Sequence, residues 1–352
     1  MDIPRFLLSA VAFGLLLFAG GCGSPGPVAG VTDASGERQV WPKPPAEPRI
    51  GYVRSVSGPQ DLGLTKSFFG RVFDMLAGQG AEHFVRPTGV ATHDGVLYVA
   101  DPGAPALWIL DAARGRYLKV DAVGDAAMVS PVAVAVRPDG AVFVADTGLK
   151  KVFLFDRDGH LVGVAAEADL ERPAGIAYDA ASKWLYVVDS AQSRITVYDP
   201  EAKVVRTWGQ GGDQSGQFNH PTHLALDETG TLRVTDALNF RIQSFDRGGR
   251  FLGTFGHAGD GSGDFAGPKG LATDSAGHIY VVDTLFDAVQ IFDSNGTYLL
   301  GFGEQGTQTG QFWLPGGIFI DPKDEIYVTD GYNQRVQVFR ALRGAASKGV
   351  AE

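Results

Sequence analysis

The sequence predicts an all-β fold, a six-bladed β-propeller whose blades are four-stranded antiparallel sheets. An apolar segment ending in aspartate occurs six times, and successive aspartates are 45, 43, 47, 47 and 47 residues apart. A proline begins each copy, and the last three copies keep a strict period of 47 residues. Repeats of this length that hold only short strands are typical of propellers, in which radial repetition leaves short, protected sheet edges. The six aspartates are Asp101, Asp146, Asp189, Asp236, Asp283 and Asp330.

The segment before the repeats is predicted to be an export signal followed by a tether. Phe6 to Phe18 form an apolar run of 13 residues, which suits the core of a signal peptide and is too short to span a bilayer comfortably. Small residues then lead to Cys22, the single cysteine of the chain. We expect a signal peptide over 1–21 and a tether rich in proline and glycine over 22–48.

The surroundings of Cys22 resemble a bacterial lipoprotein signal, in which the cysteine is lipidated and becomes the first residue of the mature chain. Ordinary cleavage after a small-x-small site is the alternative. The resemblance implies a lipid anchor in the cell envelope. Because Gly23 stands where many inner-membrane lipoproteins carry aspartate, it also implies residence at the outer membrane.

Each copy is predicted to be a meander of four short strands. In the fourth copy the strands cover 223–227, 232–236, 241–246 and 250–256, and they are rich in β-forming residues. No stretch shows a helical period long enough to cross between parallel strands. In a meander, the loops entering each first strand lie at the same end as the loops joining the second strand to the third. We call this end the top face; the bottom turns are tight.

The ends of the repeat region predict how the ring closes. The sixth copy runs into the tail 341–352 without a fourth strand, and 49–56 has strand character. We therefore expect the propeller to cover 49–340, with the N-terminal strand completing the last blade. An insertion over 58–86 enlarges one top-face loop, and an apolar stripe at helical spacing predicts a short helix over 66–76. This helix is expected to pack on the propeller as a lid; binding a partner or a membrane surface is the alternative.

The repeat signature itself resembles a known family. Pro-x-Gly-Ile-Ala, Tyr-Val-x-Asp and Asn-x-Arg-Val-Gln-Val-Phe recur, with Gly-Gln-Phe between copies, and this pattern resembles the NHL-repeat family over residues 49–340. The resemblance implies the propeller fold. It implies little about function, because similar propellers include enzymes, sensors and RNA-binding scaffolds.

Composition excludes several function classes. The formal net charge is −10, with 40 acidic and 30 basic side chains, which argues against binding nucleic acid. One cysteine permits neither an internal disulfide nor a thiolate metal cluster. The segment 301–306 matches the dinucleotide pattern GxGxxG, but no helix follows to hold a pyrophosphate.

The six strand-end aspartates are predicted to be structural. Aspartate accepts hydrogen bonds from backbone N–H groups a few residues on, and several of the six have a cation five residues later with which to pair. These cations are Lys151, Arg194, Arg241 and Arg335.

Histidines decide whether a metal site is expected. The resemblance includes an amidating lyase whose zinc is held by histidines from several inner strands, whereas only one of the six residue pairs after the first-strand prolines, Thr222-His223, contains histidine. The segments expected of lactonase-type calcium propellers are also missing. We therefore predict no catalytic residues, no metal and no cofactor.

The leading hypothesis is a monomeric, non-catalytic module that binds a protein partner or a small ligand on its top face. The alternative is a metal-dependent lyase or lactone hydrolase with its site in the central channel. Candidate contacts near the channel are His223 and Lys269. Candidates on the top-face loops are Asn239, Phe240, Phe286, Trp313, Tyr332 and Asn333.

Overall fold

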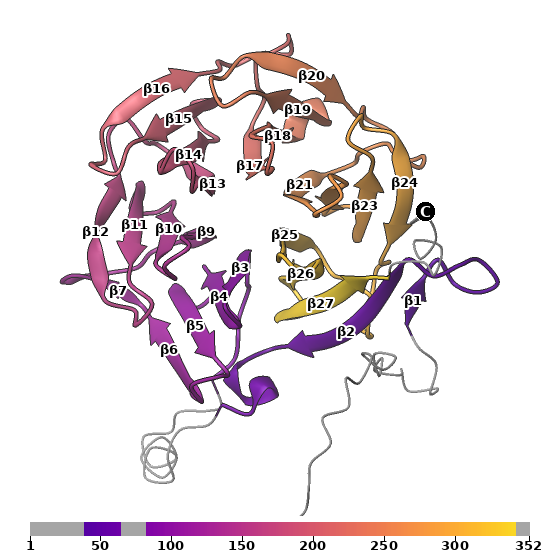
Figure 1. The fold of residues 1–352 in the computed structure, drawn as a ribbon, viewed down its shortest axis with the longest axis horizontal. Coiled ribbons are helices and arrows are strands. Elements are labelled where there is room, and N and C mark those ends of the chain that lie inside the picture. Colours follow the sequence, from indigo (N-terminus) through magenta and orange to yellow (C-terminus); the bar gives the residue numbers. More distant parts are fainter. Residues whose placement is uncertain (1–38, 65–81, 343–352) are drawn as a thin grey trace, which may run out of the picture.

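The computed structural model describes residues 39–64 and 82–342. The predicted signal peptide, Cys22 and the predicted helix over 66–76 lie outside the described residues. The described part is a ring of six antiparallel sheets, shown face-on in Figure 1, which confirms the predicted fold class. Among the described residues, no helix has the length and apolar character that a membrane crossing requires.

Blades one to five each take four strands in chain order, from the innermost strand to the outermost. Blade one contains β3 (Gly89–His93), β4 (Val96–Asp101), β5 (Ala106–Asp111) and β6 (Arg116–Val120). Blade two contains β9 (Pro131–Val136), β10 (Val142–Asp146), β11 (Lys151–Phe155) and β12 (Leu161–Ala166). Blade three contains β13 (Pro173–Asp179), β14 (Trp184–Asp189), β15 (Arg194–Tyr198) and β16 (Val204–Trp208).

The later blades follow the same plan. Blade four contains β17 (Pro221–Leu226), β18 (Leu232–Asp236), β19 (Arg241–Phe245) and β20 (Phe251–Phe255). Blade five contains β21 (Pro268–Thr273), β22 (Ile279–Asp283), β23 (Ala288–Phe292) and β24 (Tyr298–Phe302). Blade six contains β25 (Pro315–Ile320), β26 (Glu325–Asp330) and β27 (Arg335–Ala341). A small hairpin, β7 (Ala122–Val123) and β8 (Ala126–Ala127), joins blades one and two.

The N-terminal strand β2 (Ile50–Val56) completes blade six, as the sequence predicts. It pairs antiparallel with β27, from Ile50 opposite Ala341 to Val56 opposite Val336. The chain therefore enters this blade at the bottom face. A further strand, β1 (Val40–Trp41), pairs with the start of β2 and adds a fifth strand from a segment that the sequence assigns to the tether.

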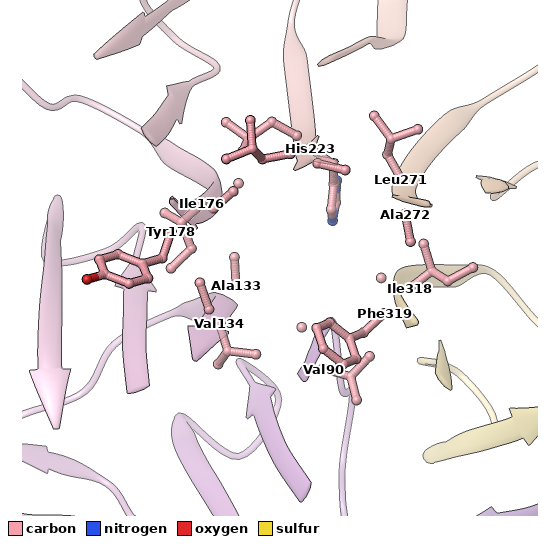
Figure 2. Close-up of a pocket in the computed structure, with 18 of the residues that line it drawn as sticks. Val90, Ala133, Val134, Ile176, Tyr178, His223, Leu271, Ala272, Ile318 and Phe319 are labelled. Carbon is pink, nitrogen blue, oxygen red and sulfur yellow. The ribbon is translucent and has the colours of Figure 1, made fainter. Parts of the chain in front are cut away.

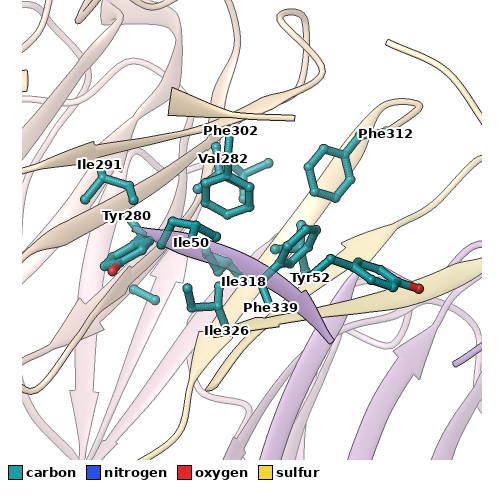
Figure 3. Close-up of a cluster of buried hydrophobic side chains, with 13 residues drawn as sticks. Ile50, Tyr52, Tyr280, Val282, Ile291, Phe302, Phe312, Ile318, Ile326 and Phe339 are labelled. Atoms are coloured by element: carbon teal, nitrogen blue, oxygen red, sulfur yellow. The ribbon is translucent and has the colours of Figure 1, made fainter. Parts of the chain in front are cut away.

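The hydrophobic core lies between neighbouring blades. Figure 3 shows the cluster between blades five and six, where Tyr280 and Ile291 of blade five meet Ile326 and Phe339 of blade six. Ile50 of the N-terminal strand is 2% exposed in this cluster. Burying apolar area in this way contributes about 25 cal/mol per Å², so each blade is stabilised by its neighbours and the ring by its closing strand.

All six strand-end aspartates are fully buried and hold the top-face loops, which confirms their structural role. In four blades both carboxylate oxygens accept backbone N–H groups from the two residues before the first-strand proline; in blade one Asp101 accepts from Val85 at 2.7 Å and Arg86 at 2.8 Å. In blades four and six only one such N–H is bound, and the second oxygen accepts from side chains. For Asp236 these are the amide of Asn239, Arg241 and Gln243.

The predicted cation pairing is only partly correct. Arg241 and Arg335 each donate from Nε to their aspartate at 2.8 Å. Arg194 does not pair with Asp189, because it reaches outward to the carbonyl of Asp169 at 2.7 Å. Lys151 likewise pairs with Glu167 at 2.8 Å instead of the buried Asp146.

The insertion before blade one is closed at its base. The Phe84 N–H donates to the Ser57 carbonyl at 2.8 Å, and a 3-10 turn, η1 (Pro59–Leu62), follows β2. Phe84 is fully buried and meets Trp108 edge-on, with ring centroids 5.7 Å apart. Both ends of the insertion therefore lie in the hydrophobic cluster between blades six and one, to which Leu64 and Phe84 belong.

Candidate functional site

The centre of the ring holds a cavity of about 230 Å³ lined by the six inner strands. Aliphatic and aromatic side chains line the lower halves of these strands together with polar atoms, and Figure 2 shows several of these side chains. They include Val90, Val134, Ile176, Leu271, Ile318 and Phe319. A site of this kind favours an apolar ligand body and offers few polar contacts to orient it.

The upper end of the cavity is a narrow ring formed by the second residue after each first-strand proline. Four of these six residues are glycine because the next blade's backbone approaches closely. A Cβ atom on Gly89 would lie 2.8 Å from the Val132 carbonyl oxygen, and one on Gly270 would lie 2.5 Å from the Gly316 carbonyl oxygen. Real Cβ atoms do not tolerate such distances, so neighbouring inner strands pack too closely here to accept a side chain on these glycines.

His223 is the exception in this ring. Blade two has Ala133 at the position, and blade four alone has a side chain longer than a methyl group. Figure 2 shows the His223 imidazole pointing toward the middle of the cavity. Its Nδ1 atom is buried without a hydrogen-bond partner. Burial, and then the nearby Lys269 ammonium, lower the pKa of His223 to about 3, so the ring is neutral at neutral pH.

Lys269 lies on the inner strand of the next blade, blade five, directly after Pro268. Its pKa is lowered first by burial and then by the positive charge of Arg86. The side chain extends toward Gly316 of blade six, since a Cβ atom there would lie 3.8 Å from the Lys269 Nζ atom. No carboxylate of the described ranges comes within ion-pair distance of this ammonium. His223 lines the cavity and Lys269 lies near enough to lower its pKa, while a binding role for either residue stays a prediction.

The top-face candidates divide into two kinds. Asn239 donates its amide to the Gly212 carbonyl and to Asp236, both at 2.9 Å, and Asn333 does the same with Gly306 and Asp330. Both side-chain amides therefore hydrogen-bond to the top-face loops and stabilise them. Phe240 and Phe286 are half-buried.

Trp313 and Tyr332 form an exposed aromatic pair. They are 45% and 52% exposed, and their ring centroids lie 5.7 Å apart. Each occupies a repeated loop position: Trp313 lies two residues before a first-strand proline, and Tyr332 lies two residues after a strand-end aspartate. These two positions also meet in blades one and two, where a Cβ atom on Gly103 would contact Val85 and one on Gly148 would contact Val129.

Four further exposed apolar side chains, which were not among the predicted contacts, occupy one or the other of these two loop positions in other blades. Together with Trp313 and Tyr332 they form what we call the apolar arc, and each member is between 40% and 64% exposed. Aligning the six copies on proline and aspartate would have found them. The arc covers every blade except the third, which carries Glu171 and Ala191 there. Its members are Val85, Val129, Leu238, Leu285, Trp313 and Tyr332.

Cations also lie in the top-face loops. The residue directly before the first-strand proline is Arg86 in blade one and Arg172 in blade three, and both are exposed. Blade four has His220 there, and its pKa is lowered by burial and then by Arg172. Two exposed arginines therefore lie in top-face loops of a chain whose net charge is −10.

The metal chemistry of the alternative hypothesis requires converging ligands. Across 39–64 and 82–342, no three His, Cys, Asp or Glu side chains lie together as a metal site would need. A second cavity, of about 710 Å³ beside blades five and six, contains Asp274 and His278 with Nδ1 2.8 Å from the carboxylate. The same arrangement joins Asp156 and His160 in another bottom turn, so it is hairpin chemistry.

Comparisons with known proteins agree with this architecture. A family model described as NHL repeat matches residues 312–339. NHL repeat-containing protein 2 is 35% identical over 83 residues in Gallus gallus and 34% identical over 83 residues in Homo sapiens. These matches cover 21% of this chain and 11% of the relative's length.

Solved structures resemble the whole ring. Virginiamycin B lyase from Staphylococcus aureus, solved with quinupristin, has a TM-score of 0.56 at 13% identity, covering 73% of this chain and 95% of that one. A gluconolactonase from Xanthomonas campestris has a TM-score of 0.54 at 17% identity, covering 74% and 87%. An auxiliary nutrient binding protein from Bacteroides thetaiotaomicron has a TM-score of 0.57 at 12% identity, covering 73% and 69%. At these identities the likeness concerns the fold alone.

Proposed function

We propose that this chain, a six-bladed β-propeller similar to NHL-repeat proteins, is a non-catalytic binding module of the cell envelope whose top face binds a partner protein. The observation that carries the proposal is the apolar arc. Soluble proteins rarely leave several large apolar side chains exposed at equivalent positions on one face, and such surfaces mark interaction sites. Tryptophan and tyrosine dominate the energetics of many interfaces, and the stacked pair of Trp313 and Tyr332 offers both.

The charges on this face indicate which partner fits. Arg86 and Arg172 directly precede first-strand prolines; Arg86 lies near enough to Lys269, and Arg172 near enough to His220, to lower their pKa values. Electrostatic complementarity favours a partner that presents an acidic centre surrounded by apolar side chains. The scaffold suits such a role, since a closed ring of packed blades holds its loops in fixed relative positions.

The membrane anchor is part of the same proposal. A lipid on Cys22 and a tether over 22–48 would attach the propeller to the envelope, and we place it at the outer membrane. The described chain enters blade six at Ile50, on the bottom face. A tether leading there supports an orientation in which the top face points away from the anchoring membrane.

Site-specific photo-crosslinking in intact cells tests this function. A photoreactive phenylalanine replaces Tyr332 or Leu285 on the arc and, as a matched control, the exposed Leu252 on the outer strand of blade four. We expect a discrete adduct of one mass from both arc positions and none from Leu252. Equal adducts from Leu252, or none from the arc, would contradict the proposal.

The alternative, a metal-dependent lyase or lactone hydrolase, has a separate test. In the described chain His223 is the one histidine lining the central cavity, and the cation Lys269 beside it opposes a divalent metal. The residues do not fit a metal centre of that kind. Elemental analysis of the dialysed full chain is expected to show no stoichiometric zinc or calcium. One equivalent per chain would favour the enzyme hypothesis.

A further inference from the structure

Blade four leaves a group of buried polar atoms without partners at the narrow end of the channel. They are Thr222 Oγ1, His223 Nδ1 and Thr235 Oγ1. Thr235 is fully buried. Buried polar atoms are nearly always hydrogen-bonded, so each exception requires an explanation, such as a bound molecule.

The other blades show that the fold does not require these polar atoms to be without hydrogen-bond partners. In blade one the Thr88 hydroxyl donates to the Val132 carbonyl at 3.0 Å. In blade six the Thr329 hydroxyl accepts from the Gly317 N–H at 2.6 Å. Thr222 and Thr235 occupy the equivalent positions of blade four, and both bonds are missing there. The change coincides with the replacement of glycine by histidine at His223.

The charged side chains at this end of the channel indicate the charge of the ligand that would fit there. Lys269 contributes an ammonium from the adjoining blade, and Arg86 lies near enough to lower its pKa. The charged neighbours that act on His223 and Lys269 are both cations, with no carboxylate among them. A neutral imidazole, two hydroxyls and an ammonium make a set of hydrogen-bond donors suited to an anion.

The cavity below this polar end indicates the rest of the ligand. Its wall is formed by aliphatic and aromatic side chains such as Val134, Ile176 and Leu271. Its volume, about 230 Å³, is sufficient for a short hydrocarbon body and no more. A fully polar anion would leave this wall unused, and a neutral hydrocarbon would leave the polar end unsatisfied.

We propose that the central channel binds a small amphipathic carboxylate, with its carboxylate between His223, Thr222 and Lys269 and its hydrocarbon chain along the lower inner strands. This site is separate from the top-face partner surface. Lys269 supplies the countercharge, and the hydroxyls and imidazole orient the carboxylate.

Calorimetric titration of the full chain tests this site with three probes. Sodium octanoate carries both the head and the chain, sodium acetate carries only the head, and 1-octanol carries only the chain. We expect octanoate to bind at least tenfold more tightly than either of the others. Equal affinity for acetate would contradict the apolar part of the site, and equal affinity for octanol would contradict the polar part.

Matched variants locate the binding. Lys269→Met keeps the length of the side chain and removes its charge, so octanoate affinity is expected to fall at least tenfold. Lys323→Met, on an exposed bottom turn, is the control and should leave affinity unchanged. Val134→Phe narrows the cavity from the opposite wall and should also abolish binding, with folding checked by circular dichroism. Unchanged octanoate affinity in Lys269→Met and in a folded Val134→Phe would overturn the proposal.

Discussion

Single residues at equivalent positions hold the top face in place. Each strand-end aspartate is fully buried and gathers N–H groups from loops that are distant in sequence. Asp236 accepts from the Asn219 backbone, from Arg241 and from Gln243. Arg241 compensates the charge of Asp236. Because Asn219, Arg241 and Gln243 all donate to this carboxylate, their arrangement depends on one side chain.

We predict that Asp236→Ala lowers the free energy of unfolding by about 3 to 5 kcal/mol, because it removes the buried carboxylate that pairs with Arg241 Nε and accepts the Asn219 N–H. Urea unfolding of the full chain measures the change. Asp260→Ala, in an exposed loop of the next copy, is the control and is expected to cost less than about 0.5 kcal/mol. Similar losses in the two variants would mean that the buried carboxylate is dispensable.

A second residue-scale prediction concerns His223 and pH. Its folded-state pKa is lowered to about 3, whereas the histidine of an unfolded chain titrates near 6.5. Between these values the unfolded state binds the extra proton, so stability falls as pH falls. This group alone contributes a slope of up to about 1.4 kcal/mol per pH unit. His223→Gln is expected to reduce the slope of unfolding free energy between pH 6 and 4.5 by about that amount, and an unchanged slope would contradict the burial of a neutral imidazole.

At the scale of strands and blades, most of the fold was predictable. The meander is a local pattern, and the period places one blade after another, so the blades and the closing strand could be read from proline, aspartate and apolar spacing alone. The β1 strand was missed because proline-rich flanks mask two residues that pair only once β2 is in place. The unpaired hydroxyls of Thr222 and Thr235 could not be predicted for a similar reason, because the hydrogen-bond partner of such a hydroxyl depends on the contact between two blades.

We predict that Ile50→Ala lowers the free energy of unfolding by about 2 to 5 kcal/mol, because it opens a cavity between blades five and six. Ile50 belongs to the closing strand and is 2% exposed. Val162→Ala, on the outer strand of blade two and 62% exposed, is the matched control and should have little effect. A loss no larger than that of the control would mean that β2 does not stabilise the ring.

At the scale of the whole molecule, three features follow one axis. The chain enters blade six at the bottom face, the cavity lies along the centre of the ring, and the apolar arc surrounds the top of the channel. His223 could be singled out from the sequence, because it is the one histidine among the six residue pairs that follow the first-strand prolines. Most of the arc was missed, because single valine and leucine residues in loops have no signal of their own until the copies are superposed.

The last prediction concerns this axis and the proposed anchor. Because Cys22 precedes the described propeller strands in the sequence, replacing it is expected to leave the fold intact and to change only where the protein resides. We expect the full chain to fractionate with the outer membrane when expressed in a bacterium, and Cys22→Ser to move to another fraction while keeping its circular dichroism spectrum. Recovery of the unsubstituted chain in the soluble fraction would contradict lipidation, and recovery in the inner membrane would contradict the sorting inferred from Gly23. If the proposed anchor leads to the bottom face, an unanchored propeller is also expected to lose the top-face crosslinks, because the partner would no longer be held at the same distance from the membrane.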